Sequence, residues 1–177
     1  MSRLRPPLCA ALVAALAVPV FESAARAQLI DSLTVALLGG SSVTFPLARG
    51  SASNSGSATL TARTSWSLVL FRTSIGLDAY FSSATAALTH QSSSNTVNIP
   101  SSRVEVSVNG GAPQPLDQTV AFGAPNAGRR LFTQPLTLFN LIDQRDDTLT
   151  LNINLAGYAL PADTYTGVLR LRARATP

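Results

Sequence analysis

Apolar and polar residues alternate along much of the chain, most clearly in residues 146–175. In 148–155 every second residue is Leu or Ile, and Thr or Asn occupies the positions between them. Residues 165–173 alternate in the same way, and their polar side continues through Arg170, Arg172 and Arg174. Because successive side chains of a strand point to opposite faces, each stretch predicts a strand with one buried face and one solvent face. A loop joins the two stretches, so we expect them to form a strand pair.

The approach to the last strand predicts a specific turn. Residues 160–165 read LPADTY, which is typical of a tyrosine corner, where a Tyr hydroxyl bonds back to the preceding loop backbone. Tyr165 would then determine how the chain enters its final strand. The alternative is an ordinary tyrosine at the edge of the core.

Shorter patterns predict further strands. Trp66 is the only tryptophan, and we expect it to anchor the core from a central strand. Asn109, Gly110 and Gly111 suit the positive-φ positions of a hairpin turn. Loops are expected at 51–57, 123–130 and 143–147. Expected strands are 33–38, 43–47, 58–62, 66–71, 103–108, 116–122 and 131–142, while 76–81 and 84–90 fit short strands or irregular segments.

Short alternating segments separated by turn residues, without a helical period, are typical of an all-β domain. We favour an antiparallel two-sheet β-sandwich, immunoglobulin-like or pilin-like, over a closed barrel. It is expected to form one domain over 28–177, preceded by a cleaved signal helix.

The N-terminus has the features of a secretory signal peptide. Arg3 and Arg5 precede an apolar run over 8–21, and the A-x-A sequence of 25–27 predicts cleavage near Ala27. The run is short for a membrane span, although a retained signal anchor is the alternative. The mature protein is therefore expected to be secreted, periplasmic or at the cell surface, with no transmembrane span.

The composition limits the kinds of site that the mature chain can contain. The only cysteine, Cys9, leaves with the signal peptide, which excludes a disulfide framework or thiolate site in the mature chain. Residues 28–177 contain ten arginines, no lysine and eight carboxylates, a net charge of +2. This balance is not a nucleic-acid footprint, so we expect no nucleic-acid partner.

Catalytic and metal patterns are lacking in the sequence. His90 is the only histidine, no G-x-S-x-G motif accompanies it, and we expect it to be exposed at a strand end. Asp143, Asp146 and Asp147 form the densest carboxylate cluster, which leaves calcium as an alternative to a plain loop. No phosphate-binding loop or dinucleotide fingerprint occurs. We assign no catalytic, cofactor or metal residue and expect no enzyme activity.

Two arginine groups could meet an anion, a polysaccharide or a nucleic acid: Arg129–Arg130, and the row Arg170, Arg172 and Arg174. A stacking platform for bases would need interleaved aromatic residues, whereas the row alternates with Leu, Val and Ala. A solvated face is the better interpretation, and its like charges discourage aggregation of strand edges.

Residues 160–169, LPADTYTGVL, resemble the closing strand of secreted bacterial pilin-like sandwiches, including spore coat U and archaic chaperone–usher fimbrial subunits. Their pattern is approximately L-P-A-G-T-Y-T-G-T-L, and Asp163 here replaces the glycine. Residues 58–70, a predicted strand that leads to Trp66, are also similar to a segment of such domains. The resemblance implies donor-strand exchange, in which an N-terminal segment completes the incomplete sandwich of a neighbour. Leu33-Val35-Leu37 or Val43-Phe45-Leu47 could serve, unless both are first strands of their own domain.

These observations lead to two hypotheses. The first is a secreted, non-enzymatic structural or adhesive protein, a pilus or coat subunit that assembles with copies of itself or related subunits by β-strand edges. The alternative is a monomeric extracytoplasmic module that binds a carbohydrate or another ligand. Such a module should have a cluster of exposed aromatic side chains. The candidates near loops are Tyr80, Phe81 and Tyr158.

Overall fold

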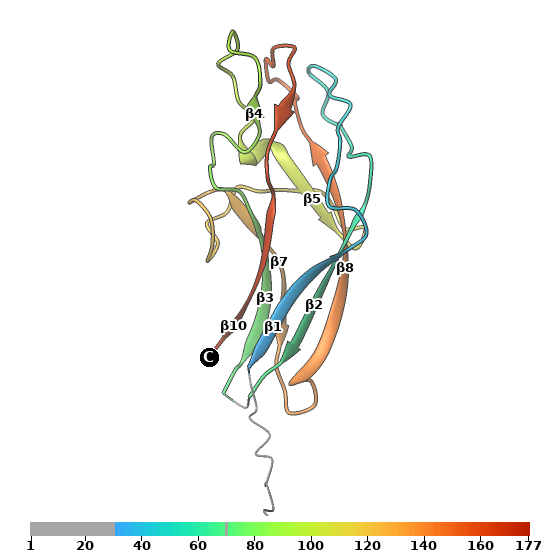
Figure 1. The fold of residues 1–177 in the computed structure, drawn as a ribbon, viewed down its shortest axis with the longest axis vertical. Helices are drawn as coiled ribbons and strands as arrows, with labels where there is room; N and C mark the ends of the chain where they lie inside the picture. The colour runs from blue at the N-terminus through green and yellow to red at the C-terminus, as the bar shows by residue number, and fades with distance from the viewer. Residues whose placement is uncertain (1–30, 70) are drawn as a thin grey trace, which may run out of the picture.

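A computed structural model describes residues 31–69 and 71–177 (Figure 1). This part of the chain is all-β, as predicted, and forms three antiparallel sheets. Within the described residues, the only helical element is the single 3-10 turn η1 (Ser101–Arg103). The predicted signal helix of residues 1–27 lies outside the described residues, and the assignment of 28–177 to one domain stays a prediction.

Two of the sheets are large. The five-stranded sheet has the order β1 (Ser32–Leu38), β2 (Leu60–Ser67), β8 (Ile142–Ile153), β5 (Val104–Val108) and β6 (Gln114–Pro115). The three-stranded sheet has the order β10 (Arg170–Thr176), β3 (Ser74–Tyr80) and β7 (Gly128–Pro135). A small third sheet pairs β4 (Thr89–His90) with β9 (Tyr165–Thr166).

The two large sheets contribute to one core. Leu60, Ala62 and Trp66 alternate inward on β2, as predicted, and they join Ile75 and Leu77 of β3 in the same buried cluster. The predicted alternation in 148–155 is also confirmed, because its four apolar residues are all buried. A second cluster lies under the loops near the third sheet and contains Ile99, Ile153, Leu155 and Leu160.

The predicted pairing of the last two long strands is wrong. β8 pairs with β2 and β5, whereas β10 pairs with β3 in the other large sheet. The loop after β8 therefore crosses from one sheet to the other. Alternation predicts which face of a strand is buried, but it carries no information about the partner strand.

The tyrosine corner is confirmed. The Tyr165 hydroxyl donates a hydrogen bond to the Pro161 carbonyl oxygen at 3.0 Å. The Asn95 side-chain amide donates to the same hydroxyl and to the Asp163 carboxylate, both at 2.9 Å. Asp163, at the position where the resembling family has glycine, thus helps to hold the loop that precedes β10.

The hairpin turn is confirmed, but its return strand is much shorter than predicted. Asn109 and Gly110 have φ angles of 52° and 75°, which is the conformation such a turn requires. Only Gln114–Pro115 then pairs with β5, and residues 116–122 form no strand. Leu116 is instead buried in the core, with its amide bonded to the Val104 carbonyl at 3.0 Å.

Several strand boundaries also differ from the predictions. Residues 143–147, expected as a loop, belong to β8 because they continue its register with β2. The strand expected over 131–142 begins earlier and ends at Pro135, and β2 ends at Ser67 rather than continuing to 71. Residues 43–47 form no strand, although Val43 and Phe45 pack against the core as the alternation predicts.

Candidate functional site

The two large sheets end along two long sides of the molecule, and these sides differ. On one side β1 pairs with β2 and lies beside β10, although no ladder joins β1 to β10 (Figure 1). We call this side the β1 seam. On the other side the described chain leaves two strand edges unpaired: the outer edge of β7 over 131–135, and β8 over 142–147, because β5 pairs only with 149–153. We call this side the β7–β8 cleft.

At the β1 seam the backbone pairing is complete but the packing is shallow. All seven residues of β1 pair with β2, from Ser32 opposite Ser67 to Leu38 opposite Thr61. Leu33 and Val35 are half-buried against the core, whereas Leu37 and Leu38 are each 41% exposed. All of β1 is described, and none of its residues is buried. Strand pairing therefore holds β1 more than side-chain burial does.

Asp31 anchors the start of β1. Its carboxylate accepts a hydrogen bond from the Val69 backbone amide at 2.9 Å and forms an ion pair with Arg72 at 3.2 Å. The Val69 hydrogen bond is the main reason that the pKa of Asp31 is lowered from 3.8. After β1, residues 39–59 contain no strand in the described structure, apart from an isolated bridge between Ser55 and Asn152.

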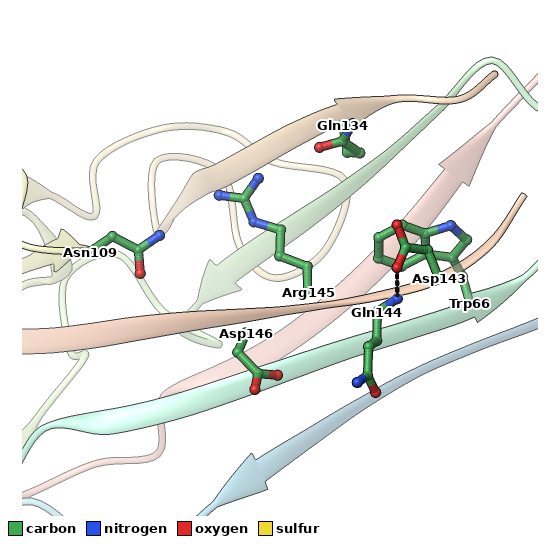
Figure 2. Close-up of a pocket in the computed structure, with 7 residues that line it drawn as sticks. All are labelled: Trp66, Asn109, Gln134, Asp143, Gln144, Arg145 and Asp146. Carbon is green, nitrogen blue, oxygen red and sulfur yellow. Dashed lines mark hydrogen bonds between the residues drawn. The ribbon is translucent and has the colours of Figure 1, made fainter. Parts of the chain in front are cut away.

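The β7–β8 cleft has a volume of about 420 Å³ (Figure 2). Its walls are Gln134 of β7 and the first part of β8, its floor includes Trp66, and Asn109 of the hairpin turn lies at one end. The Trp66 indole donates to the Asn140 carbonyl at 2.7 Å, which holds the loop that joins β7 to β8.

The inward positions of β8 along this cleft are charged. Asp143 lies opposite Trp66 in the register, and Arg145 points from β8 toward β7 (Figure 2). The next inward residue, Asp147, is 0% exposed. Its carboxylate accepts hydrogen bonds from the Arg145 guanidinium at 2.8 Å and from the Asn109 side-chain amide at 2.8 Å. The Arg145 guanidinium also lies 4.4 Å from the Phe132 ring centroid. The cleft thus contains a fixed ion pair rather than an apolar groove.

The three aspartates proposed for calcium are separated by the strand. Asp146 is exposed on the opposite face of β8 from the buried Asp147 and forms an ion pair with Arg63 at 2.6 Å. The hydrogen bond from Arg63 is the main cause that lowers the pKa of Asp146. No three His, Cys, Asp or Glu side chains in the described residues are grouped to hold a metal ion. The arrangement does not favour calcium binding at this cluster.

The other candidates have separate surroundings. His90 is half-buried in β4, and its Nδ1 lies 2.9 Å from the Ser92 carbonyl oxygen. Phe81 is buried, Tyr80 packs on Phe122, and Tyr158 donates to the Asn98 carbonyl at 2.7 Å. These three aromatic residues do not form the exposed cluster that a carbohydrate-binding module would need.

The two arginine groups are arranged differently from each other. Arg170, Arg172 and Arg174 are exposed, as predicted for a solvent face. Arg129 and Arg130 are neighbours on β7 and point to opposite faces of the sheet: Arg129 bonds to the Pro115 carbonyl at 3.0 Å, and Arg130 binds the buried Asp78. Sequence reasoning missed Asp78, although a lone carboxylate within the apolar strand 75–80 is a sign of a buried ion pair.

No family model, curated protein or solved structure matches this chain. Among the described residues, no helix is long and apolar enough to cross a membrane.

Proposed function

We propose that this protein is an exported, non-enzymatic structural subunit whose two large sheets form a pilin-like sandwich and which assembles by exchange of β1. The observation that carries the proposal is the position of β1 at its seam. β1 makes a full backbone ladder with β2, lies beside β10, and buries none of its seven side chains. A strand held in this way can be replaced by the β1 of another copy at little cost.

The connection after β1 suits this exchange. Residues 39–42, which join β1 to the packed segment 43–47, form no strand that would tie β1 to its own domain. A second copy would restore the same ladder and the same contacts of Leu33 and Val35, so exchange leaves the contact set unchanged. Because each copy would donate one strand and accept another, the contact is head-to-tail and can extend into a filament.

The other segment considered for donation, 43–47, is less suited. Its backbone bonds to its own loop, since the Thr44 carbonyl accepts from the Ser57 amide at 2.8 Å and the Thr44 amide bonds to the Ser57 hydroxyl at 3.1 Å. Val43 and Phe45 are packed against the core beside it. We therefore assign the donor role to β1 alone.

The test uses the full chain, expressed with its N-terminal segment and recovered from the cell. Size-exclusion chromatography and electron microscopy over a range of concentrations should give oligomers or filaments that increase with concentration. A variant lacking 32–38 should stop assembling, and a synthetic peptide of 31–39 should bind to it and restore its thermal transition. The matched control is the same peptide with Leu33→Asp and Val35→Asp, which should restore nothing.

The proposal fails if the full chain is a monomer at every concentration and the peptide does not restore the deleted variant. β1 would then be simply the first strand of its own domain.

A further inference from the structure

The outer face of the three-stranded sheet gathers arginines from two strands. Residues directly opposite in an antiparallel pair share a face. Arg170, Arg172 and Arg174 of β10 lie opposite Tyr80, Asp78 and Gly76 of β3, so their side chains share that face. Arg130 of β7 reaches it from the other side through its pairing with Asp78. We call this surface, together with the Phe122 ring, the arginine face.

Positive charge is concentrated on this face. It holds four arginines and one carboxylate, Asp78, a net charge of +3, whereas residues 28–177 as a whole carry only +2. In the described parts of the chain, no carboxylate lies within ion-pair distance of Arg170, Arg172 or Arg174, while five other arginines have such a partner. The three side chains of the row are thus free to bind an external anion.

Arg130 is held in place at the centre of the face. Its Nε and Nη2 atoms donate to the two oxygens of Asp78, which is 0% exposed, while 30% of its own side chain remains exposed. Its guanidinium lies over Gly76, where a Cβ atom would come within 2.6 Å of Nη1. The glycine makes room for this arrangement. Arg130 therefore presents a positioned cation beside the three freer arginines of β10.

Phe122 adds an aromatic residue that the local sequence of β10 lacks. The Arg172 guanidinium lies 4.2 Å from the Phe122 ring centroid, and Phe122 packs on Tyr80 with centroids 6.0 Å apart. This contact orients Arg172. It also occupies a face of the ring, which is therefore not open to stack on a nucleic-acid base. The surface favours recognition of charge over recognition of bases.

We propose that the arginine face binds an acidic polysaccharide through its carboxylate groups. Alternate residues of a strand repeat at about 6.8 Å, so the three arginines of β10 span about 14 Å. A row of this length suits an extended polymer rather than one small anion. Guanidinium groups bind carboxylates with paired hydrogen bonds, and the sequence contains no lysine. This activity is separate from strand exchange, which uses the backbone edge of β1.

The test measures binding of polygalacturonate to the full chain by isothermal titration calorimetry, with neutral dextran as the control polymer. Polygalacturonate should bind and dextran should not, and the affinity should fall as sodium chloride is raised. The variant Arg170→Gln/Arg174→Gln should bind about tenfold more weakly. Phe122→Leu, which removes the contact that orients Arg172, should weaken binding about threefold.

The matched control is Arg49→Gln/Arg103→Gln, which removes the same charge away from the face and should bind within about twofold of the wild type. Melting curves of both double variants establish that they are folded. Equal weakening by the two double variants, or no binding of polygalacturonate, would overturn the proposal. Tighter binding of a single-stranded oligonucleotide than of polygalacturonate at equal salt would overturn it in favour of nucleic acid.

Discussion

The β1 seam and the β7–β8 cleft are the two sides on which the large sheets end, and they differ in the chemistry of their inward positions. At the seam these positions hold Leu33 and Val35, with Leu171 and Ala173 of β10 close by in the same core. Along the cleft they hold charged side chains: Asp143, Arg145 and Asp147. The comparison shows that strand edges of one molecule can differ in the charge that a further strand would have to cover.

The physical reason is the cost of removing a charge from water. An apolar strand over the cleft would cover the Arg145 guanidinium, which is now partly exposed, without giving it a further partner. An apolar strand at the seam covers only apolar surface and completes a ladder. The chemistry of the inward residues therefore favours β1 exchange at the seam and leaves the cleft open.

The largest expected effect comes from breaking the ion pair in the cleft. Asp147→Ala leaves Arg145 and Asn109 without their shared acceptor, and it should lower the free energy of unfolding by about 3 kcal/mol. Urea denaturation measures this change. The control is Asp143→Ala, because Asp143 lies on the same face of β8 as Asp147 but is exposed to solvent. This variant should change the free energy of unfolding by less than about 0.5 kcal/mol. Equal values for both variants would contradict the importance of the buried pair.

A charge placed in the seam should have the next largest effect. Val35→Asp puts a carboxylate on the half-buried face of β1 and should lower the free energy of unfolding by about 2 kcal/mol, with loss of assembly. Denaturation and size-exclusion chromatography measure the two effects. Thr34→Asp adds the same charge on the exposed face of β1 and should leave both nearly unchanged. Assembly that survives Val35→Asp would count against the seam as the site of exchange.

A smaller change in stability should result from making the cleft resemble the seam. In Arg145→Met/Asp147→Leu, apolar residues replace the whole ion pair, so stability should stay within about 1 kcal/mol of the wild type. The cleft would then have an apolar floor beside two open edges, and we expect new self-association. Analytical ultracentrifugation, carried out in a variant that also lacks 32–38, separates this association from β1 exchange. A monomeric product would show that charge is not what keeps the cleft open.

The smallest effect should come from acid at the start of β1. Because the fold lowers the pKa of Asp31, its carboxylate contributes stability above the usual value of 3.8. That contribution should be lost as the pH falls below 3.8 and passes through the lowered pKa. Thermal melting of the wild type and Asp31→Asn between pH 5 and about pH 2.5 measures it. The two curves should converge in acid, and a constant difference between them would contradict the assignment.

Local patterns predicted the features that depend on neighbouring residues. Several features were found as expected: the buried face of 148–155, the exposed arginines of 170–174, the positive φ of Asn109 and Gly110, and the Tyr165 hydrogen bond. Each of these depends on alternation or on a few consecutive residues, and that information is present in the sequence.

The features that were mispredicted or missed depend on ion pairs or on contacts between residues far apart in the sequence. Residues 143–147 looked like a loop because they are polar, yet pairing with β2 and the bond between Arg145 and Asp147 place them in a strand. The arginine row is exposed as predicted, but its contact with an aromatic ring was missed because Phe122 lies 50 positions away from Arg172 in the sequence. No local pattern indicates that these two side chains meet.

The sequence by itself determined an all-β chain, the faces of its main strands and the turn that leads into the last strand. Only the tertiary structure decided that β8 and β10 belong to different sheets, that β1 lies beside β10 on one side, and that charges line the other. Side-chain alternation is a local property of a strand. The choice of partner strands depends on contacts distant in sequence and on which charged groups can be paired when water is removed.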